Sequence, residues 1–158
     1  MEHLKQKLTS EPIINHHPDW SKPFILDTDA GPMGISAVLS QMIDGRERVV
    51  MYASRKQSDV ETRYHQYEKE ALALVWGVEL MRPYLYGRKF LARTDNQALK
   101  YLYTRSQNSR VMRWVMRLQE FSFDIQHRHR GQTRREKAEA APQASCQAHR
   151  QQAHFSRA

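Results

Sequence analysis

Residues 24–30 read Phe-Ile-Leu-Asp-Thr-Asp-Ala, a short apolar run that carries two acids and lies between a proline and a Gly-Pro pair. Such a run is typical of a strand that ends in a turn. Another run follows at 33–41, and the pair Asp44-Gly45 separates it from a third at 48–54. Because Asp-Gly between apolar runs is a hairpin signal, we expect three consecutive antiparallel strands here.

The sequence period changes after these strands. Ser58 and Glu61 have the spacing of a capping box, which predicts that a long helix begins there and continues to Met81. The remaining chain predicts, in order, a strand, a short helix, a second helix and a last alternating strand, at 89–95, 97–103, 111–120 and 121–127. The order βββαβααβ is that of an α/β layered domain with a mixed sheet.

The net charge of +8 and the pI near 9.8 are unevenly distributed over the 158 residues. Residues 127–158 hold seven basic and two acidic side chains, so they carry +5 and the first 126 residues carry +3. Residues 132–158 contain no Val, Ile, Leu or Met, and we expect a disordered, low-complexity tail there. A solvated tail and a nucleic-acid-binding arm are both compatible with its composition.

Several protein classes are excluded by composition. No apolar run approaches the ~20 residues that a membrane helix needs, and the first residues lack the apolar core of a secretory signal. Cys146 is the single cysteine, so a disulfide framework or a cysteine-rich zinc site is not expected. We therefore expect an intracellular protein, with a cytoplasmic particle and the nucleus both open.

Three acids occupy unusual positions in the predicted elements. Asp29 and Asp95 end apolar strands, and Glu70 lies among alanines and leucines of the long helix. If the two strands are neighbours and the helix packs over them, the three carboxylates converge, and such a cluster favours Mg²⁺ or Mn²⁺. Two such ions roughly 4 Å apart are suited to phosphodiester hydrolysis. By spacing alone this signal is weak, and separate surface acids with no shared site are the favoured interpretation.

Six stretches, in order and over about 100 residues, resemble the ribonuclease H domain of gypsy-type LTR-retrotransposon pol polyproteins. They are FILDTDAGPMGISAVLSQ (24–41), YASR (52–55), YHQYEKEALALVW (64–76), RPYLYGRKF (82–90), RTDNQAL (93–99) and RWVMRLQEF (113–121). The resemblance implies a ribonuclease H-like fold, with a five-stranded mixed sheet of three antiparallel and then two parallel strands, flanked by helices. It also implies a domain at 23–131, after a connector at 1–22 that resembles the segment following a reverse-transcriptase polymerase domain.

The same resemblance implies the chemistry. The family's catalytic and metal-binding acids match Asp29, Glu70 and Asp95. The implied cofactors are two Mg²⁺ ions, for which Mn²⁺ can substitute. The implied activity is that of an endonuclease that cuts the RNA strand of an RNA–DNA hybrid. The polymerase domain of the same polyprotein is the implied partner. Asp27 lies on the same strand face as Asp29, and Glu68 lies about 200° round the helix from Glu70; neither matches the motif.

The fourth acid of the family is altered in this chain. The family's last helix begins near Ala-Asp-Ala-Leu-Ser-Arg, whereas this chain reads Ala138-Glu139-Ala140 and soon reaches Pro142. Glu139 is the candidate fourth catalytic and metal ligand, one methylene longer than Asp and without the following Leu. The alternative is that the chain has diverged into unrelated tail sequence.

Four polar residues are candidate nucleic-acid contacts: Ser54, Arg55, Asn96 and Gln97. The first two end a strand near the expected site, and the last two follow Asp95, where related enzymes contact the minor groove; ordinary capping and surface roles are the alternatives. His127 is compatible with a catalytic accessory role or with an exposed strand end.

Two functions remain after the sequence is read. The first is a ribonuclease H domain of a retrotransposon reverse transcriptase. The second is a catalytically degenerate retroelement-derived domain that binds nucleic acid or a protein partner, and the altered fourth motif favours it. An integrase-type core is disfavoured, because its Glu lies on a late helix whereas Glu70 precedes Asp95.

Overall fold

A six-stranded mixed sheet forms the centre of the computed structural model, which describes residues 13–14, 17–102 and 108–128. The strands, in the spatial order β1-β4-β3-β2-β5-β6, are β1 (Ile13–Ile14), β4 (Arg46–Lys56), β3 (Gly34–Ile43), β2 (Ile25–Ala30), β5 (Lys89–Thr94) and β6 (Ser122–His127). Strands β2, β3 and β4 are antiparallel neighbours, whereas β5 runs parallel to β2 and β6 parallel to β5. The predicted five-stranded mixed sheet is confirmed, and the two-residue β1 adds a sixth strand beside β4.

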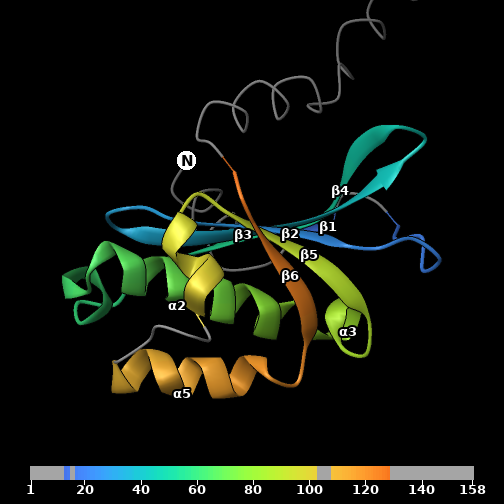
Figure 1. The fold of residues 1–158 in the computed structure, drawn as a ribbon. Coiled ribbons are helices and arrows are strands. Elements are labelled where there is room, and N and C mark those ends of the chain that lie inside the picture. The colour runs from blue at the N-terminus through green and yellow to red at the C-terminus, as the bar shows by residue number, and fades with distance from the viewer. Residues whose placement is uncertain (1–12, 15–16, 103–107, 129–158) are drawn as a thin grey trace, which may run out of the picture.

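The helices cover one face of this sheet in two layers (Figure 1). They are α2 (Gln66–Leu80), α3 (Arg82–Leu85) and α5 (Ser109–Leu118), with short 3-10 turns η1 (Glu61–Arg63) and η2 (Gln97–Tyr101). Helix α2 packs against β2 and β3 on one side and α5 on the other, so residues 71–75 are all buried. Because this part of the helix is buried on both sides, it is apolar all round and lacks the polar face of a surface helix.

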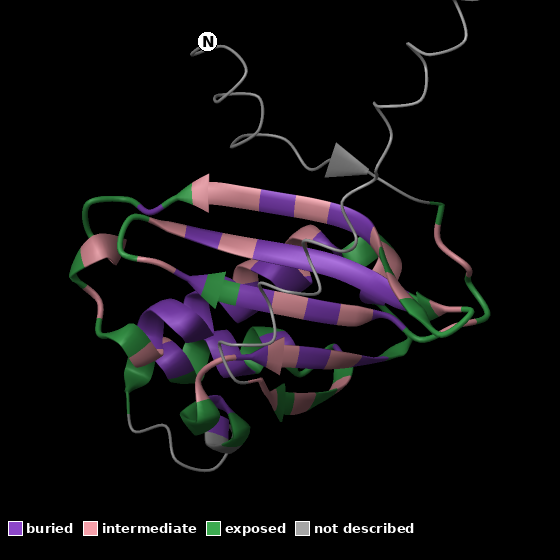
Figure 2. Ribbon diagram, turned by 90° about the horizontal axis from the view of Figure 1, so that it is seen from above, coloured by how far each residue is buried: buried purple, intermediate pink, exposed green. Residues whose placement is uncertain are grey.

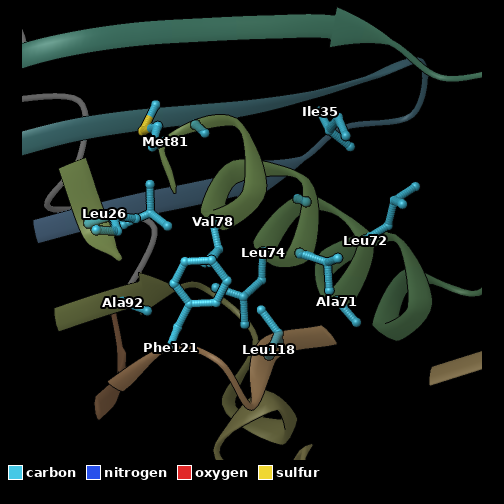
Figure 3. Packing of buried hydrophobic residues seen from close by; sticks show 14 of the residues in the cluster. Leu26, Ile35, Ala71, Leu72, Leu74, Val78, Met81, Ala92, Leu118 and Phe121 are labelled. Atoms are coloured by element: carbon cyan, nitrogen blue, oxygen red, sulfur yellow. The ribbon is translucent and has the colours of Figure 1, made fainter. Parts of the chain in front are cut away.

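Gly77 lets α2 lie close to the sheet. A Cβ atom at this position would come within 3.0 Å of Ala37 Cβ and 3.2 Å of Thr28 Cγ2. The side chains that fill the interface come from all three layers, including Leu26, Leu74 and Leu118 (Figure 3). On β2 and β5, buried residues alternate with more exposed ones, as Figure 2 shows from above the sheet.

The hairpin prediction is confirmed at Asp44-Gly45, where both residues have positive φ (53° and 75°) in a two-residue connection between β3 and β4. This is the conformation that favours Asp-Gly in hairpin turns.

The predicted start of the long helix is wrong. Ser58 and Glu61 do exchange the two hydrogen bonds of a capping box, Ser58 N–H to Glu61 Oε2 at 2.9 Å and Glu61 N–H to Ser58 Oγ at 3.3 Å. They close only the single turn η1, because the backbone becomes extended at Tyr64, and α2 begins at Gln66.

Some predictions lie outside the described residues: Glu139, the tail at 132–158 and much of the connector at 1–22. Within the described part of the chain, no helix combines the length and apolar character needed to cross a membrane.

Candidate metal centre

Three elements bring the predicted acids to one end of the sheet. Asp29 is the penultimate residue of β2, and Asp95 directly follows β5. Because β2 and β5 are parallel neighbours, their carboxyl ends lie at the same edge. Glu70 lies in the first turns of α2, which packs on β2.

The three carboxylates converge, as the sequence predicts. One oxygen of each side chain lies within 4.8 Å of the other two. Asp29 is exposed and Asp95 half-buried, whereas Glu70 is only 1% exposed. The cluster therefore has a buried floor and a side that is open to solvent.

The amide of Gln66 holds the Glu70 carboxylate from one turn earlier on α2. Its Nε2 donates to Glu70 Oε1 at 2.7 Å and to the Ala30 carbonyl at 3.0 Å, which ties the start of the helix to the end of β2. The other oxygen, Glu70 Oε2, is buried and accepts no hydrogen bond from the residues that the structure describes.

Burial, together with the neighbouring charges of Asp95 and Asp29, raises the pKa of Glu70 to about 8, although the hydrogen bond from Gln66 opposes this rise. A carboxylate that is desolvated beside two other acids, with one oxygen unsatisfied, is destabilised unless a proton or a cation neutralises it. Hard divalent cations prefer such oxygen ligands, so the donor set fits Mg²⁺ or Mn²⁺.

Asp27, two residues before Asp29, has a structural partner instead. Arg93 Nε donates to Asp27 Oδ1 at 2.9 Å, and the same guanidinium also contacts Glu47. Arg128 adds a third link, at 3.2 Å, to Asp27 Oδ1. Burial raises the pKa of Glu47, but hydrogen bonds from Arg93 and Ser40 outweigh this and hold it below the ordinary value.

Glu68 is likewise engaged in the fold. Its carboxylate accepts hydrogen bonds from Asn108 Nδ2 at 2.6 Å, from Arg110 at 2.9 Å and from the His65 backbone N–H at 3.1 Å. Glu68 therefore caps α2 and links it to the start of α5, on a different side of the helix from Glu70.

The four predicted nucleic-acid contacts have different surroundings. Arg55 forms a bidentate pair with Glu61, at 2.7 and 3.0 Å, and lies over the Trp76 ring on the α2 side of the sheet. Asn96 caps η2 by accepting from the Ala98 N–H. Ser54 is half-buried on β4, and Gln97 is exposed at the start of η2.

A family model described as the RNase H-like domain found in reverse transcriptase matches residues 19–121. The chain belongs to this family. Its match covers all three clustered acids and ends within the connection between α5 and β6.

Relatives of this RNase H-like domain are retrotransposon polyproteins. The chain is 38% identical over 127 residues to the retrovirus-related Pol polyprotein from transposon 297 of Drosophila melanogaster, covering 80% of the chain and 12% of the relative. It is 36% identical over 134 residues to the transposon Tf2-3 polyprotein of Schizosaccharomyces pombe, covering 81% and 10%. The chain thus spans about a tenth of the length of these relatives.

Two solved structures share the fold at low sequence identity. The foamy viral protease-reverse transcriptase dRH in complex with double-stranded DNA matches with a TM-score of 0.59 and 14% identity, over 70% of this chain and 20% of that one. LC11-RNase H1 in complex with an RNA/DNA hybrid matches with a TM-score of 0.56 and 14% identity, over 73% and 91%.

Two site residues were not identified from the sequence. Gln66 lies four residues before Glu70, which is one helical turn, so the i, i+4 spacing could have indicated the contact. The Arg93 pair with Asp27 joins residues 66 positions apart, and no local pattern indicates it.

Proposed function

We propose that this RNase H-like domain hydrolyses the RNA strand of RNA–DNA hybrids in a divalent-metal-dependent, endonucleolytic reaction. One observation carries the proposal: Asp29, Glu70 and Asp95 each place a carboxylate oxygen within 4.8 Å of the other two, and buried Glu70 has an oxygen, Oε2, without a hydrogen-bond partner among the described residues. An arrangement so costly without a counter-charge is the signature of a cation site rather than of a structural ion pair.

Asp29, Glu70 and Asp95 would hold two Mg²⁺ ions, with Mn²⁺ as a substitute, and Glu139 is the proposed fourth ligand. Bound metal ions supply an activated water and neutralise charge that develops on the scissile phosphate. The chain's own residues prepare the site: Gln66 fixes one oxygen of Glu70, and Asp29 faces solvent, from which a phosphate approaches.

A hybrid duplex is the substrate that we assign to the open side of the cluster. Selectivity for a hybrid requires contacts to 2′-hydroxyls across the minor groove, while phosphate contacts fix the register. Ser54, Arg55, Asn96 and Gln97 remain the proposed contacts. Arg55 pairs with Glu61 and Asn96 caps η2, so a nucleic acid would have to share these side chains with their partners in the fold.

The polymerase domain of the same polyprotein is the proposed partner, with residues 1–22 as connector, 23–131 as the domain and 132–158 as a tail. The polyprotein relatives, of which this chain spans about a tenth, support this assignment. An intracellular location remains a prediction.

The test compares wild-type protein with Asp29→Asn on a labelled RNA–DNA hybrid in Mg²⁺ or Mn²⁺, with hybrid binding measured in parallel by fluorescence anisotropy. Metal-dependent cleavage by the wild type alone supports the proposal. Equal binding by both proteins with no cleavage by either would instead support the degenerate, binding-only alternative.

The fourth ligand is tested separately with Glu139→Gln and the matched control Glu136→Gln. If Glu139 binds metal, its substitution abolishes cleavage while the control stays active. A fully active Glu139→Gln protein would show that Glu139 is not the fourth ligand.

A further inference from the structure

The two strands that carry the aspartates separate before they reach them. Pairing between β2 and β5 covers only Ile25–Asp27 and Leu91–Arg93. Asp29 lies beyond the last pair but is still paired with Ser36 of β3. Asp95 lies past the end of β5 and beyond the pairing of β5 with β2. The β2–β5 ladder therefore ends before it reaches either carboxylate.

Strand β6, on the other side of β5, stays paired to the end of that strand. Its pairing with β5 continues to Thr94 and His127, and the Arg128 N–H donates to the Thr94 carbonyl at 2.8 Å. Beyond the ladder, His127 Nε2 lies 3.0 Å from the carbonyl oxygen of Asp95. Because a carbonyl oxygen only accepts hydrogen bonds, the imidazole nitrogen is the donor.

The end of β6 is itself anchored. Arg128 makes an ion pair with Asp27 at 3.2 Å, and both side chains are mostly buried. His127 is half-buried beside it. The imidazole therefore projects from a fixed piece of backbone, which is what a side chain needs to hold another group in place.

Two hydrogen bonds beside Asp95 are local. Asn96 N–H donates to Thr94 Oγ1 at 3.2 Å, and Asn96 Oδ1 accepts from the Ala98 N–H. These contacts shape the turn into η2 but do not connect it to a neighbouring strand. The contact with His127 crosses 32 residues of sequence and connects the turn to the sheet.

We propose that His127 is a positioning residue: its ring N–H holds the Asp95 backbone so that the carboxylate stays directed at Asp29 and Glu70. The inference rests on the proposed function, because the fixed direction of the carboxylate matters for binding a metal ion. Like charges in the cluster push the Asp95 carboxylate outward, and the imidazole opposes that movement. Groups that orient metal ligands in this way typically change metal affinity by about 10- to 100-fold when they are removed.

Two substitutions isolate the hydrogen bond. His127→Phe keeps a ring of similar size and loses the donor, whereas His127→Gln keeps an amide donor. Gln126→Ala is the matched control, since Gln126 is the exposed preceding residue on β6. Each full-length variant is titrated with Mn²⁺ by calorimetry, assayed on a hybrid for kcat and KM, and melted without metal.

We expect His127→Phe to bind Mn²⁺ about 10-fold more weakly than the wild type and to lose kcat with an unchanged KM for the hybrid. His127→Gln should recover most of the affinity, and Gln126→Ala should match the wild type. Thermal stability should change little in any of them.

Unaltered Mn²⁺ affinity in His127→Phe, beside a wild type that binds and cleaves, would overturn this inference and leave the proposed function intact. Equal loss in the Phe and Gln variants, accompanied by a lower melting temperature, would also overturn it, because His127 would then be purely structural. A wild type that binds no Mn²⁺ would overturn both proposals.

Discussion

Asparagine substitutions at Asp27 and Asp29, two residues apart on β2, are expected to have opposite effects on stability and on cleavage. Asp27 faces the Arg93 guanidinium, and the two side chains are 14% and 13% exposed. Asp29 is exposed and lies in a cluster with Glu70 and Asp95. The first substitution therefore disrupts an ion-pair network, and the second removes one charge from a repulsive cluster.

The magnitude for Asp27→Asn follows from burial. Removing one partner of a buried ion pair costs about 3–5 kcal/mol, whereas an exposed pair contributes under about 1 kcal/mol. Asparagine keeps one acceptor oxygen, and Glu47 still contacts Arg93, so we expect a loss of about 2 kcal/mol in the free energy of unfolding. For a domain of this size, that lowers Tm by roughly 8 °C.

The assay combines urea unfolding with hybrid cleavage at a temperature where both variants are folded. Asp27→Asn should lose stability and still cleave within a few-fold of the wild-type rate. Asp29→Asn should stay within about 0.5 kcal/mol of the wild-type stability and lose cleavage by at least about 100-fold. The reverse pattern, with a stable but inactive Asp27→Asn and an active Asp29→Asn, would refute the assignment of the two acids.

Three further substitutions test the site and its support. Between pH about 5 and 8, and without metal, the folded protein keeps a proton on Glu70 that the unfolded chain has already released. The free energy of unfolding should therefore fall as pH rises through this window, by on the order of a few kcal/mol. Glu70→Gln should remove that decrease in urea unfolding with EDTA, and an unchanged pH slope would contradict the raised pKa. Gly77→Ala should lower the free energy of unfolding by about 1–3 kcal/mol, because the new Cβ would meet Ala37. This cost exceeds the roughly 1 kcal/mol by which alanine favours a helix over glycine. A stabilised variant would contradict the close packing. Glu68→Gln should lose about 1–2 kcal/mol through its contact with Arg110 and should still cleave hybrids; an inactive but stable variant would give Glu68 the role assigned to Glu70.

The features that could be predicted from sequence are those that local backbone chemistry determines. Asp44 and Gly45 tolerate positive φ, so they identify the hairpin whatever surrounds it. The apolar runs identify the strands in the same way. The helix start was mispredicted because Ser58 and Glu61 form the correct hydrogen bonds around only one turn, and where the helix begins depends on the extended backbone at Tyr64.

The contacts that distinguish a structural acid from a candidate metal ligand could not be predicted from residue spacing. Asp27 and Asp29 share a strand period, so spacing does not distinguish them; the family motif favours Asp29, and in the structure Arg93 on a neighbouring strand pairs with Asp27. The pair between Arg55 and Glu61 could not be predicted for the same reason, since Glu61 lies on a turn whose packing the sequence does not indicate. The convergence of the three acids was predicted only on the condition that the two strands are neighbours, and it was the family resemblance, not the spacing, that favoured this condition.

The central claim, metal-dependent hydrolysis of RNA in a hybrid, is tested most directly by one time course. A single RNA–DNA hybrid, labelled differently on each strand, is incubated with the purified protein in Mg²⁺ and in EDTA. We predict that the RNA strand is cut at internal positions in Mg²⁺, that the DNA strand stays intact, and that Asp95→Asn and EDTA each abolish the reaction. An intact RNA strand in Mg²⁺ and in Mn²⁺, or cleavage that persists equally in Asp95→Asn, would contradict the claim.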